Sequence, residues 1–137
     1  MAAGPTARTL ERLRKEKKLA QVVEQWVPRA NVRRDLFGFA DIVALEPLLG
    51  FTAIQCTSGS NHAARKAKII MEPRALVWLK AGGAILICSW SKTGPRGCRK
   101  VWTERTERIS ESDFSDAVDL ERRERFPWWN DLVRKAG

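Results

Sequence analysis

The sequence predicts an α/β protein in which a mixed β-sheet is flanked by helices. Three runs rich in apolar and β-branched residues indicate strands, at 39–45, 51–57 and 84–90. Segments with helical periodicity precede the first run and separate the second run from the third. Such an alternation of strands and helices is typical of a sheet that is covered by helices.

The first two runs are expected to pair as an antiparallel hairpin, because only the tight turn at 46–50 joins them. The third run is apolar at nearly every position, as in a strand covered on both faces. A basic turn follows it and leads to an expected edge strand at 101–105.

Helices are expected at residues 6–18, 62–71 and 74–81. In the first of them, Ala7, Leu10 and Leu13 recur at three-residue spacing and form a narrow apolar stripe. Residues 19–27 fit either a helix or a short strand, and Pro28 ends the segment in both cases.

The chain of 137 residues has the length of one domain. We expect residues 1–109 to form this domain and residues 110–137 to form a helical and aromatic tail, in which Trp128 and Trp129 suggest part of a dimer interface. The sequence contains neither a membrane-spanning apolar stretch nor the apolar region of a signal peptide. The expected location is therefore the cytoplasm or nucleoid.

The charge balance favours a polyanionic partner. Lys and Arg total 25 against 16 Asp and Glu, which gives a formal net charge of +9. A charge of this size is typical of proteins that bind nucleic acid or a membrane surface.

The cysteines predict no covalent framework. Cys56, Cys88 and Cys98 are odd in number and lack the paired spacing of zinc ligands. We expect two buried thiols and one loop thiol, all reduced.

Polar residues interrupt the two hairpin strands. A buried carboxylate such as Asp41 costs several kcal/mol unless it is paired or binds a cation. Gln55 and Thr57 alternate with Cys56 and therefore point to one face of their strand. If the hairpin places Asp41 beside Gln55, their oxygens and a backbone carbonyl form a site of the kind that Mg²⁺ prefers.

These pieces resemble the PD-(D/E)XK nuclease superfamily, in particular archaeal-type Holliday junction resolvases and VRR-NUC-like phage nucleases. The resemblance rests on TLERLR with Glu11, RRDLFGFADIVAL with Asp41, and AIQCTSGS with Gln55 and Thr57, and it spans about residues 9–90. It implies a restriction-endonuclease-like fold with an α-β-β-β-α-β core. It also implies Mg²⁺-dependent hydrolysis of DNA, with Mn²⁺ as a substitute.

The resemblance assigns the metal ligands as Asp41, Gln55, Glu11 and the carbonyl of Cys56. Gln55 stands where the family has an acid, and Thr57 stands where it has the lysine that orients water. On the helix that follows, with Ala63 and Ala67 as the buried face, Lys66 and Lys68 lie to either side and each is a candidate for the displaced lysine.

Plainer interpretations stay open beside these assignments. Asp41 can be a core acid paired with Arg33 or Arg34, and Gln55 can be a hydrogen-bonded core amide. Glu11 lies among basic residues and has the pattern of a solvated surface acid, so Asp35 and Glu24 are rival third acids.

The sequence hypothesis is a Mg²⁺-dependent, structure-selective DNA endonuclease that acts as a homodimer in a bacterial or phage-infected cell. The resemblance implies a branched substrate such as a Holliday junction. Two alternatives are a catalytically inactive nuclease fold that binds DNA or serves assembly, and a basic RNA- or ribosome-associated protein. The expected nucleic-acid contacts are Arg33, Arg34, Ser58, Lys92, Arg96 and Arg99.

Overall fold

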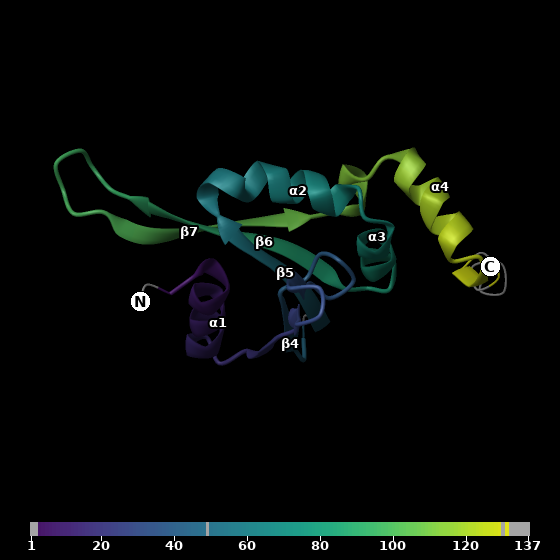
Figure 1. Cartoon of the computed structure of the whole chain (residues 1–137), viewed down its shortest axis with the longest axis horizontal. Coiled ribbons are helices and arrows are strands. Elements are labelled where there is room, and N and C mark those ends of the chain that lie inside the picture. Colours follow the sequence, from purple (N-terminus) through teal and green to yellow (C-terminus); the bar gives the residue numbers. More distant parts are fainter. Residues whose placement is uncertain (1–2, 49, 130, 132–137) are drawn as a thin grey trace.

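Five strands form a mixed sheet at the centre of the molecule (Figure 1). The computed structural model describes residues 3–48, 50–129 and 131. The strands are β1 (Leu19–Val22), β4 (Ile42–Glu46), β5 (Gly50–Ser58), β6 (Ala84–Thr93) and β7 (Val101–Ile109). They lie in the order β1-β4-β5-β6-β7, and β5 and β6 are parallel while the other neighbours are antiparallel. The α/β class is therefore confirmed.

Helices cover both faces of this sheet. α1 (Pro5–Lys15) lies on one face, and α2 (His62–Ile70) and α3 (Pro73–Lys80) lie on the other (Figure 1). A short 3-10 turn, η1 (Gly59–Asn61), links β5 to α2. Because α2 and α3 separate β5 from its parallel neighbour β6, they serve as the crossover that a parallel pair requires.

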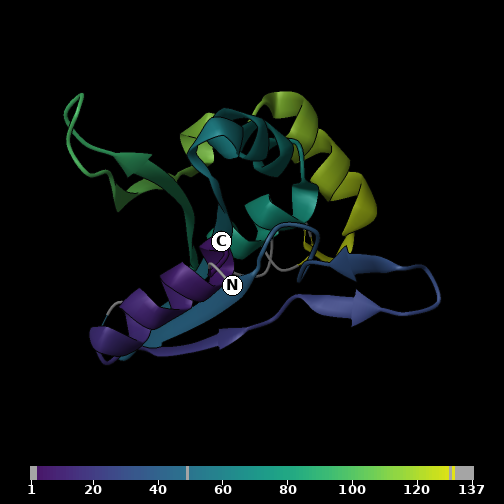
Figure 2. The same ribbon diagram turned by 60° about the vertical axis from the view of Figure 1, so that its left-hand side comes forward.

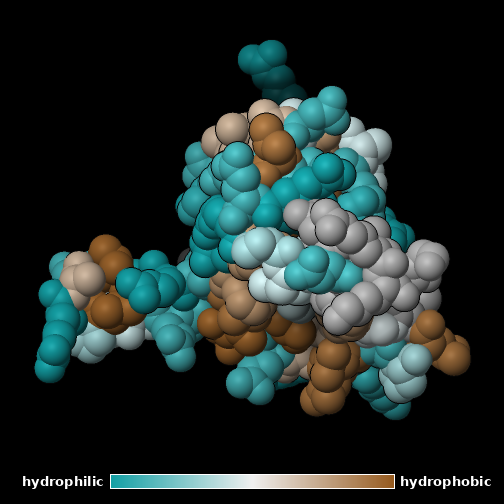
Figure 3. Space-filling view, turned by 90° about the vertical axis from the view of Figure 1, so that its right-hand side faces the viewer, coloured by the Kyte–Doolittle hydropathy of each residue, from teal (hydrophilic) through white to brown (hydrophobic). Residues whose placement is uncertain are grey.

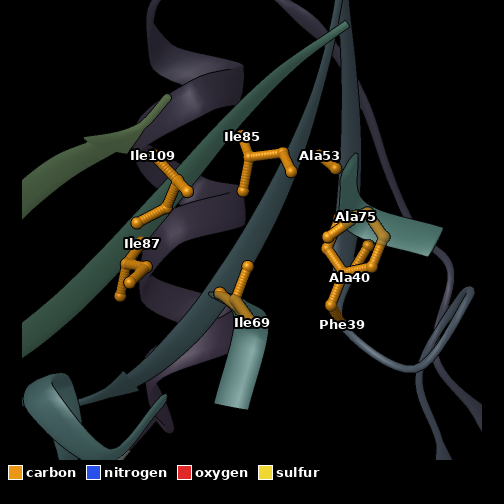
Figure 4. Packing of buried hydrophobic residues seen from close by; sticks show 8 residues of the cluster. All are labelled: Phe39, Ala40, Ala53, Ile69, Ala75, Ile85, Ile87 and Ile109. Atoms are coloured by element: carbon orange, nitrogen blue, oxygen red, sulfur yellow. The ribbon is translucent and has the colours of Figure 1, made fainter. Parts of the chain in front are cut away.

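Two apolar clusters hold the layers together. The cluster under α2 and α3 consists of Phe39, Ala40, Ala53, Ile69, Ala75, Ile85, Ile87 and Ile109 (Figure 4). The cluster under α1 consists of Leu13, Ile42, Ala44, Ile54, Cys56 and Cys88. Neighbouring residues of β5 and β6 thus alternate between the two cores, which confirms a sheet buried on both faces.

The predicted hairpin is present, and α1 differs from its predicted stripe. β4 and β5 pair antiparallel as the sequence predicts, from Ile42↔Ile54 to Glu46↔Gly50, but β4 begins at Ile42 and not at residue 39, because residues 36–40 form a turn. On α1, however, Ala7 is exposed and Thr9 is fully buried. Thr9 faces the sheet because its hydroxyl accepts a hydrogen bond of 2.9 Å from the Trp90 indole, an interaction that apolar periodicity does not reveal.

The ambiguous segment at 19–27 contains two strands. Its first half is the sheet edge β1, and its second half is β2 (Gln25–Val27), which pairs with β3 (Val32–Arg34) as a separate two-stranded hairpin. Figures 2 and 3 show this hairpin standing clear of the body. The sequence did not predict β3.

The C-terminal segment begins as an ordered part of the domain. After the 3-10 turn η2 (Glu111–Asp113), α4 (Asp116–Arg125) buries Val118 and Arg122 and lies near α3. Trp128 is half exposed, and the Arg122 guanidinium lies 5.1 Å from the Trp129 ring centroid. The remainder of the predicted tail, residues 130 and 132–137, lies outside the described residues.

Cys56 and Cys88 are buried and Cys98 is exposed, as predicted. Of the helices that the structure describes, none combines the length and the apolar character needed to cross a membrane.

Removal of a core side chain tests this packing. Ile87 is fully buried between β5 and the helices, so we expect Ile87→Ala to lower the free energy of unfolding by about 2–5 kcal/mol in urea titration. Leu120→Ala removes a side chain that is 59% exposed and should change it by less than about 0.5 kcal/mol. Equal losses in the two variants would contradict the assigned core.

Candidate functional site

The structure brings Asp41 and Gln55 together, as the sequence predicts. Asp41 immediately precedes β4 and is 4% exposed. Its Oδ2 accepts hydrogen bonds of 2.8 Å from the Gln55 side-chain Nε2 and from the Cys56 backbone N–H. The carboxylate is therefore held on two sides by the neighbouring strand.

Asp41 takes this position because β4 begins late relative to β5. The Asp41 backbone N–H still donates to the carbonyl of Ile54, at 2.9 Å. The next N–H of β5 on this side belongs to Cys56, which lies beyond the last pair of β4 with β5, Ile42↔Ile54. The Asp41 carboxylate supplies the missing acceptor, so a backbone group that would otherwise be buried and unpaired is satisfied.

Two more acids lie beside Asp41. Carboxylate oxygens of Glu24, Asp35 and Asp41 all lie within 4.8 Å of one another. Glu24 directly precedes β2, and Asp35 directly follows β3. The two ends of the β2–β3 hairpin therefore meet at Asp41, and we call these three residues the acid cluster.

A tight turn joins Asp35 to Asp41. Leu36 and Ala40 form a bridge across it, and Phe37 and Gly38 both have positive φ, at 52° and 79°. Positive φ at both central residues is the geometry of tight hairpin turns, in which glycine is favoured at such positions. Phe37 bears the backbone strain there, and its ring lies 6.5 Å from that of Trp78.

The surroundings of Asp41 favour its neutral form. Burial raises the pKa of Asp41 to about 8, the backbone bond from Cys56 opposes this rise, and Asp35 adds to it. Arg33 forms its ion pair with Glu24, at 2.8 Å. Within the described part of the chain no arginine pairs with Asp41, so the structure does not support the plainer interpretation of an Asp41–Arg33 or Asp41–Arg34 pair.

The acid cluster has the donor set of a divalent-cation site. Hard cations such as Mg²⁺ bind oxygens at about 2.1 Å in octahedral geometry, so two ligand oxygens are about 3 Å apart on neighbouring positions and about 4 Å apart on opposite ones. Three oxygens within 4.8 Å of one another are close to this range of spacings. Gln55 now donates its nitrogen to Asp41, and a half-turn of its amide would offer an oxygen instead.

Glu11 lies apart from this cluster. Its side chain is 66% exposed and pairs with Lys15 at 3.3 Å on the surface of α1. Glu24 and Asp35, the rival acids, occupy the place that the family resemblance gave to Glu11. The Cys56 carbonyl lies 3.4 Å from the Gln55 amide nitrogen, which keeps it at the edge of the site.

The buried face of α2 differs from the predicted one. Ala63 and Ala67 are exposed, whereas His62 and Ile69 are buried and Lys66 is half-buried. The face of α2 that is buried depends on polar partners on β6 and β7, which the sequence of the helix itself does not indicate.

Neither candidate lysine joins the acids in this structure. Lys66 binds Glu107 on β7, with 2.6 Å between Nζ and Oε2, and Lys68 is exposed. Thr57 is buried, and its strand partner on β6 is Ser89.

A hydrogen-bonded chain that the sequence did not predict lies on this face. His62 Nδ1 is 2.7 Å from Ser89 Oγ, and His62 Nε2 is 2.8 Å from a carboxylate oxygen of Glu107. The order Ser–His–Glu matches that of a hydrolase triad. Ser89 is 1% exposed and has no access for a substrate, so the chain serves to fix α2 on β6 and β7.

The predicted nucleic-acid contacts fall in three places. Arg33 and Arg34 lie on the exposed strand β3 next to the acid cluster. Ser58 ends β5, and its hydroxyl lies 3.1 Å from that of Ser60. Lys92, Arg96 and Arg99 lie on the hairpin that joins β6 to β7, which extends away from the body (Figure 1).

A cavity of about 440 Å³ opens beside Asp35. Its lining includes the side of the turn at Phe37 and Gly38 and two cationic residues, Arg34 and Arg74. Arg74 belongs to α3, which is distant from Asp35 in the sequence, so the sequence analysis did not predict its place here.

Comparison of the chain with protein-family models, with curated proteins and with solved structures finds no match.

The pKa of Asp41 leads to a test of stability against pH. A raised carboxyl pKa means that the neutral form stabilises the fold, fully below the unfolded pKa of about 3.9 and progressively less as the pH rises to about 8. With EDTA present, the wild-type free energy of unfolding should fall over this window by on the order of a few kcal/mol more than that of Asp41→Asn, which stays neutral. Urea titrations at pH 4.5, 6.5 and 8.5 measure the difference, and identical pH dependences would contradict the neutral carboxyl.

Proposed function

We propose that this protein is a divalent-metal-dependent DNA endonuclease. The observation that carries the proposal is the acid cluster, in which Glu24, Asp35 and the buried Asp41 offer oxygens within 4.8 Å beside Gln55. Burial and the neighbouring acids oppose ionisation of Asp41, so a cation bound in the cluster would favour its charged form.

The order of elements supports a restriction-endonuclease-like fold. α1, β1, β4, β5, α2 and β6 occur in the α-β-β-β-α-β order that the family resemblance implies, with β2–β3 and α3 as additional elements. Asp41, which immediately precedes β4, lies beside Gln55 of the neighbouring strand β5, in agreement with the nuclease assignment.

The chain's own residues have distinct roles in this proposal. Asp41, whose Oδ2 accepts from Cys56 and Gln55, offers a carboxylate oxygen together with those of Glu24 and Asp35. A bound Mg²⁺, or Mn²⁺ in its place, would polarise the scissile phosphate and neutralise the charge that develops on it. Because the pKa of Asp41 is about 8 without a cation, binding must displace a proton, so affinity rises with pH through this range.

The cavity beside Asp35 supports a phosphate as the neighbouring ligand. Arg34 and Arg74 line it, and guanidinium groups bind phosphate oxygens. The Arg74 Nε already pairs with Glu72, so Arg34 is the cation of this lining that carries the argument. The net charge of +9 agrees with a nucleic-acid partner. A branched substrate and a homodimer remain expectations of the family resemblance.

A second candidate function is a DNA-binding subunit without catalysis. Thr57 stands in the lysine position, Lys66 is engaged by Glu107, and Lys68 is exposed. With this arrangement neither candidate lysine orients water at the acid cluster. This candidate keeps the DNA contacts and dispenses with the metal chemistry.

Cleavage of a labelled four-way junction tests the endonuclease. We expect Mg²⁺-dependent products with the wild type and a loss of more than about 100-fold in rate with Asp41→Ala. A smaller loss is expected with Glu24→Ala or Asp35→Ala, because the buried Asp41 remains in both variants. Glu11→Ala is the matched control, because Glu11 is an exposed acid on α1 and should retain the wild-type rate.

Two outcomes decide between the candidates. Wild-type protein that binds the junction but cuts it with neither Mg²⁺ nor Mn²⁺ would leave only the non-catalytic subunit. In an active protein, Lys66→Ala and Lys68→Ala choose between the lysines, and full activity in both would exclude a displaced lysine on α2.

A further inference from the structure

The β6–β7 hairpin extends well beyond the sheet to which it belongs. Pairing of β6 with β5 ends at Ser58↔Trp90, whereas pairing of β6 with β7 continues to Thr93↔Val101. Residues 91–103 therefore form the end of a hairpin whose strand pairs, among the described residues, have no third strand beside them. We call this segment the arm, and Figure 1 shows it reaching away from the body at the left.

The arm is basic throughout. It carries four cations and no acid, and all four are exposed: Lys92, Arg96, Arg99 and Lys100. In the described part of the chain none of these four forms an ion pair, whereas most of the other basic side chains do. Mutual repulsion at this density is relieved by an anionic partner.

Side chains of α1 fix the base of the arm. Arg12 binds Glu104 of β7 at 2.8 Å, and Thr9 accepts the 2.9 Å hydrogen bond from Trp90 of β6. The Arg8 guanidinium lies 3.9 Å from the centroid of the Trp102 ring. The base is thus held before any partner binds, which reduces the entropy lost on binding.

We propose that the arm enters the major groove of a DNA duplex and binds its phosphates, at a distance from the acid cluster. A two-stranded ribbon is marginal on its own, so the arm is not explained by the stability of the fold. The major groove of B-form DNA is about 12 Å wide and admits such a ribbon. This inference rests on the proposed function for the choice of DNA and names duplex DNA as the substrate class.

The residues of the arm favour duplex DNA over other nucleic acids. Its outer part, residues 91–101, contains no aromatic side chain on which an unpaired base would stack, and the Trp102 ring is engaged by Arg8. The major groove of A-form RNA is too deep and narrow for side chains to read. The arm and the β2–β3 hairpin project in different directions (Figure 2), so one duplex must extend well past the cleavage site to reach both.

Binding measured in EDTA tests the arm separately from catalysis. We expect Arg96→Ala/Arg99→Ala to bind a 30-base-pair duplex on the order of 50-fold more weakly at 0.1 M salt, and to lower the slope of log affinity against log salt by about 1.8. The matched control Arg123→Ala/Arg125→Ala removes the same charge from α4. Its slope of log affinity against log salt should stay within about 0.5 of the wild-type slope.

Equal effects of the two double variants would overturn the proposal, because they would show only the loss of net charge. So would an equal loss for single-stranded DNA or duplex RNA, since neither offers the groove. Because EDTA removes divalent cations, the wild type should bind the duplex in this assay without cleaving it. A failure of cleavage therefore leaves this test intact, and a failure of the arm leaves the cleavage test intact.

A dye on Cys98 locates the contact directly. Cys98 lies in the arm and is exposed, whereas Cys56 and Cys88 are buried, so a maleimide dye reacts there selectively. Its fluorescence anisotropy should rise more on addition of duplex than that of the same dye placed at Glu124→Cys on a Cys98→Ser background. An equal or smaller rise at Cys98 would overturn the proposal.

Discussion

The two hydrogen bonds from Gln55 and Cys56 to Asp41 fix the position of the Asp41 carboxyl group in the candidate site. They satisfy a β5 backbone group at the point where β4 has not yet begun, and they place a carboxyl group in the interior where its charged form is unfavourable. The remaining acids follow from the chain path, because the β2–β3 hairpin leaves and rejoins the core on either side of Asp41. Glu24 and Asp35, at the two ends of the β2–β3 hairpin, therefore lie where the protonation state of Asp41 affects them.

The acid cluster and the basic arm belong to different hairpins of the molecule. The acid cluster lies at the base of the β2–β3 hairpin, with Arg34 and Arg74 lining a cavity beside Asp35. The basic arm of residues 91–103 lies beyond the last strand pairing of the sheet, and α1 holds it there through Arg8, Thr9 and Arg12. α1 therefore serves as a brace for the arm as well as a cover for the sheet, which explains why a polar Thr9 is buried under it.

Much of the fold was predictable because it depends on local patterns. The runs that form β4, β5 and β6 are apolar and β-branched, and Pro and Gly mark their ends, so their type and the pairing of β4 with β5 follow from the sequence. The errors on the buried faces of α1 and α2 share one cause, which is polar pairing across the fold. Ala63 and Ala67 suit a buried helix face, yet Ser89 and Glu107 draw His62 and Lys66 inward instead. β3 was missed because exposed arginines carry no periodicity that marks a strand.

The sequence by itself determined the α/β class, the antiparallel hairpin, the burial of Asp41 and its partnership with Gln55, since strand register and alternation place them together. Only the tertiary structure decided which acids accompany Asp41. Glu11, Glu24 and Asp35 are equivalent as residue types, and the difference between them is the path of the chain around a hairpin that local patterns do not reveal. The same holds for the basic turn between β6 and β7. Its charge alone predicted nucleic-acid contacts, and only the structure shows that β6 and β7 extend beyond their neighbour β5 and form an arm there.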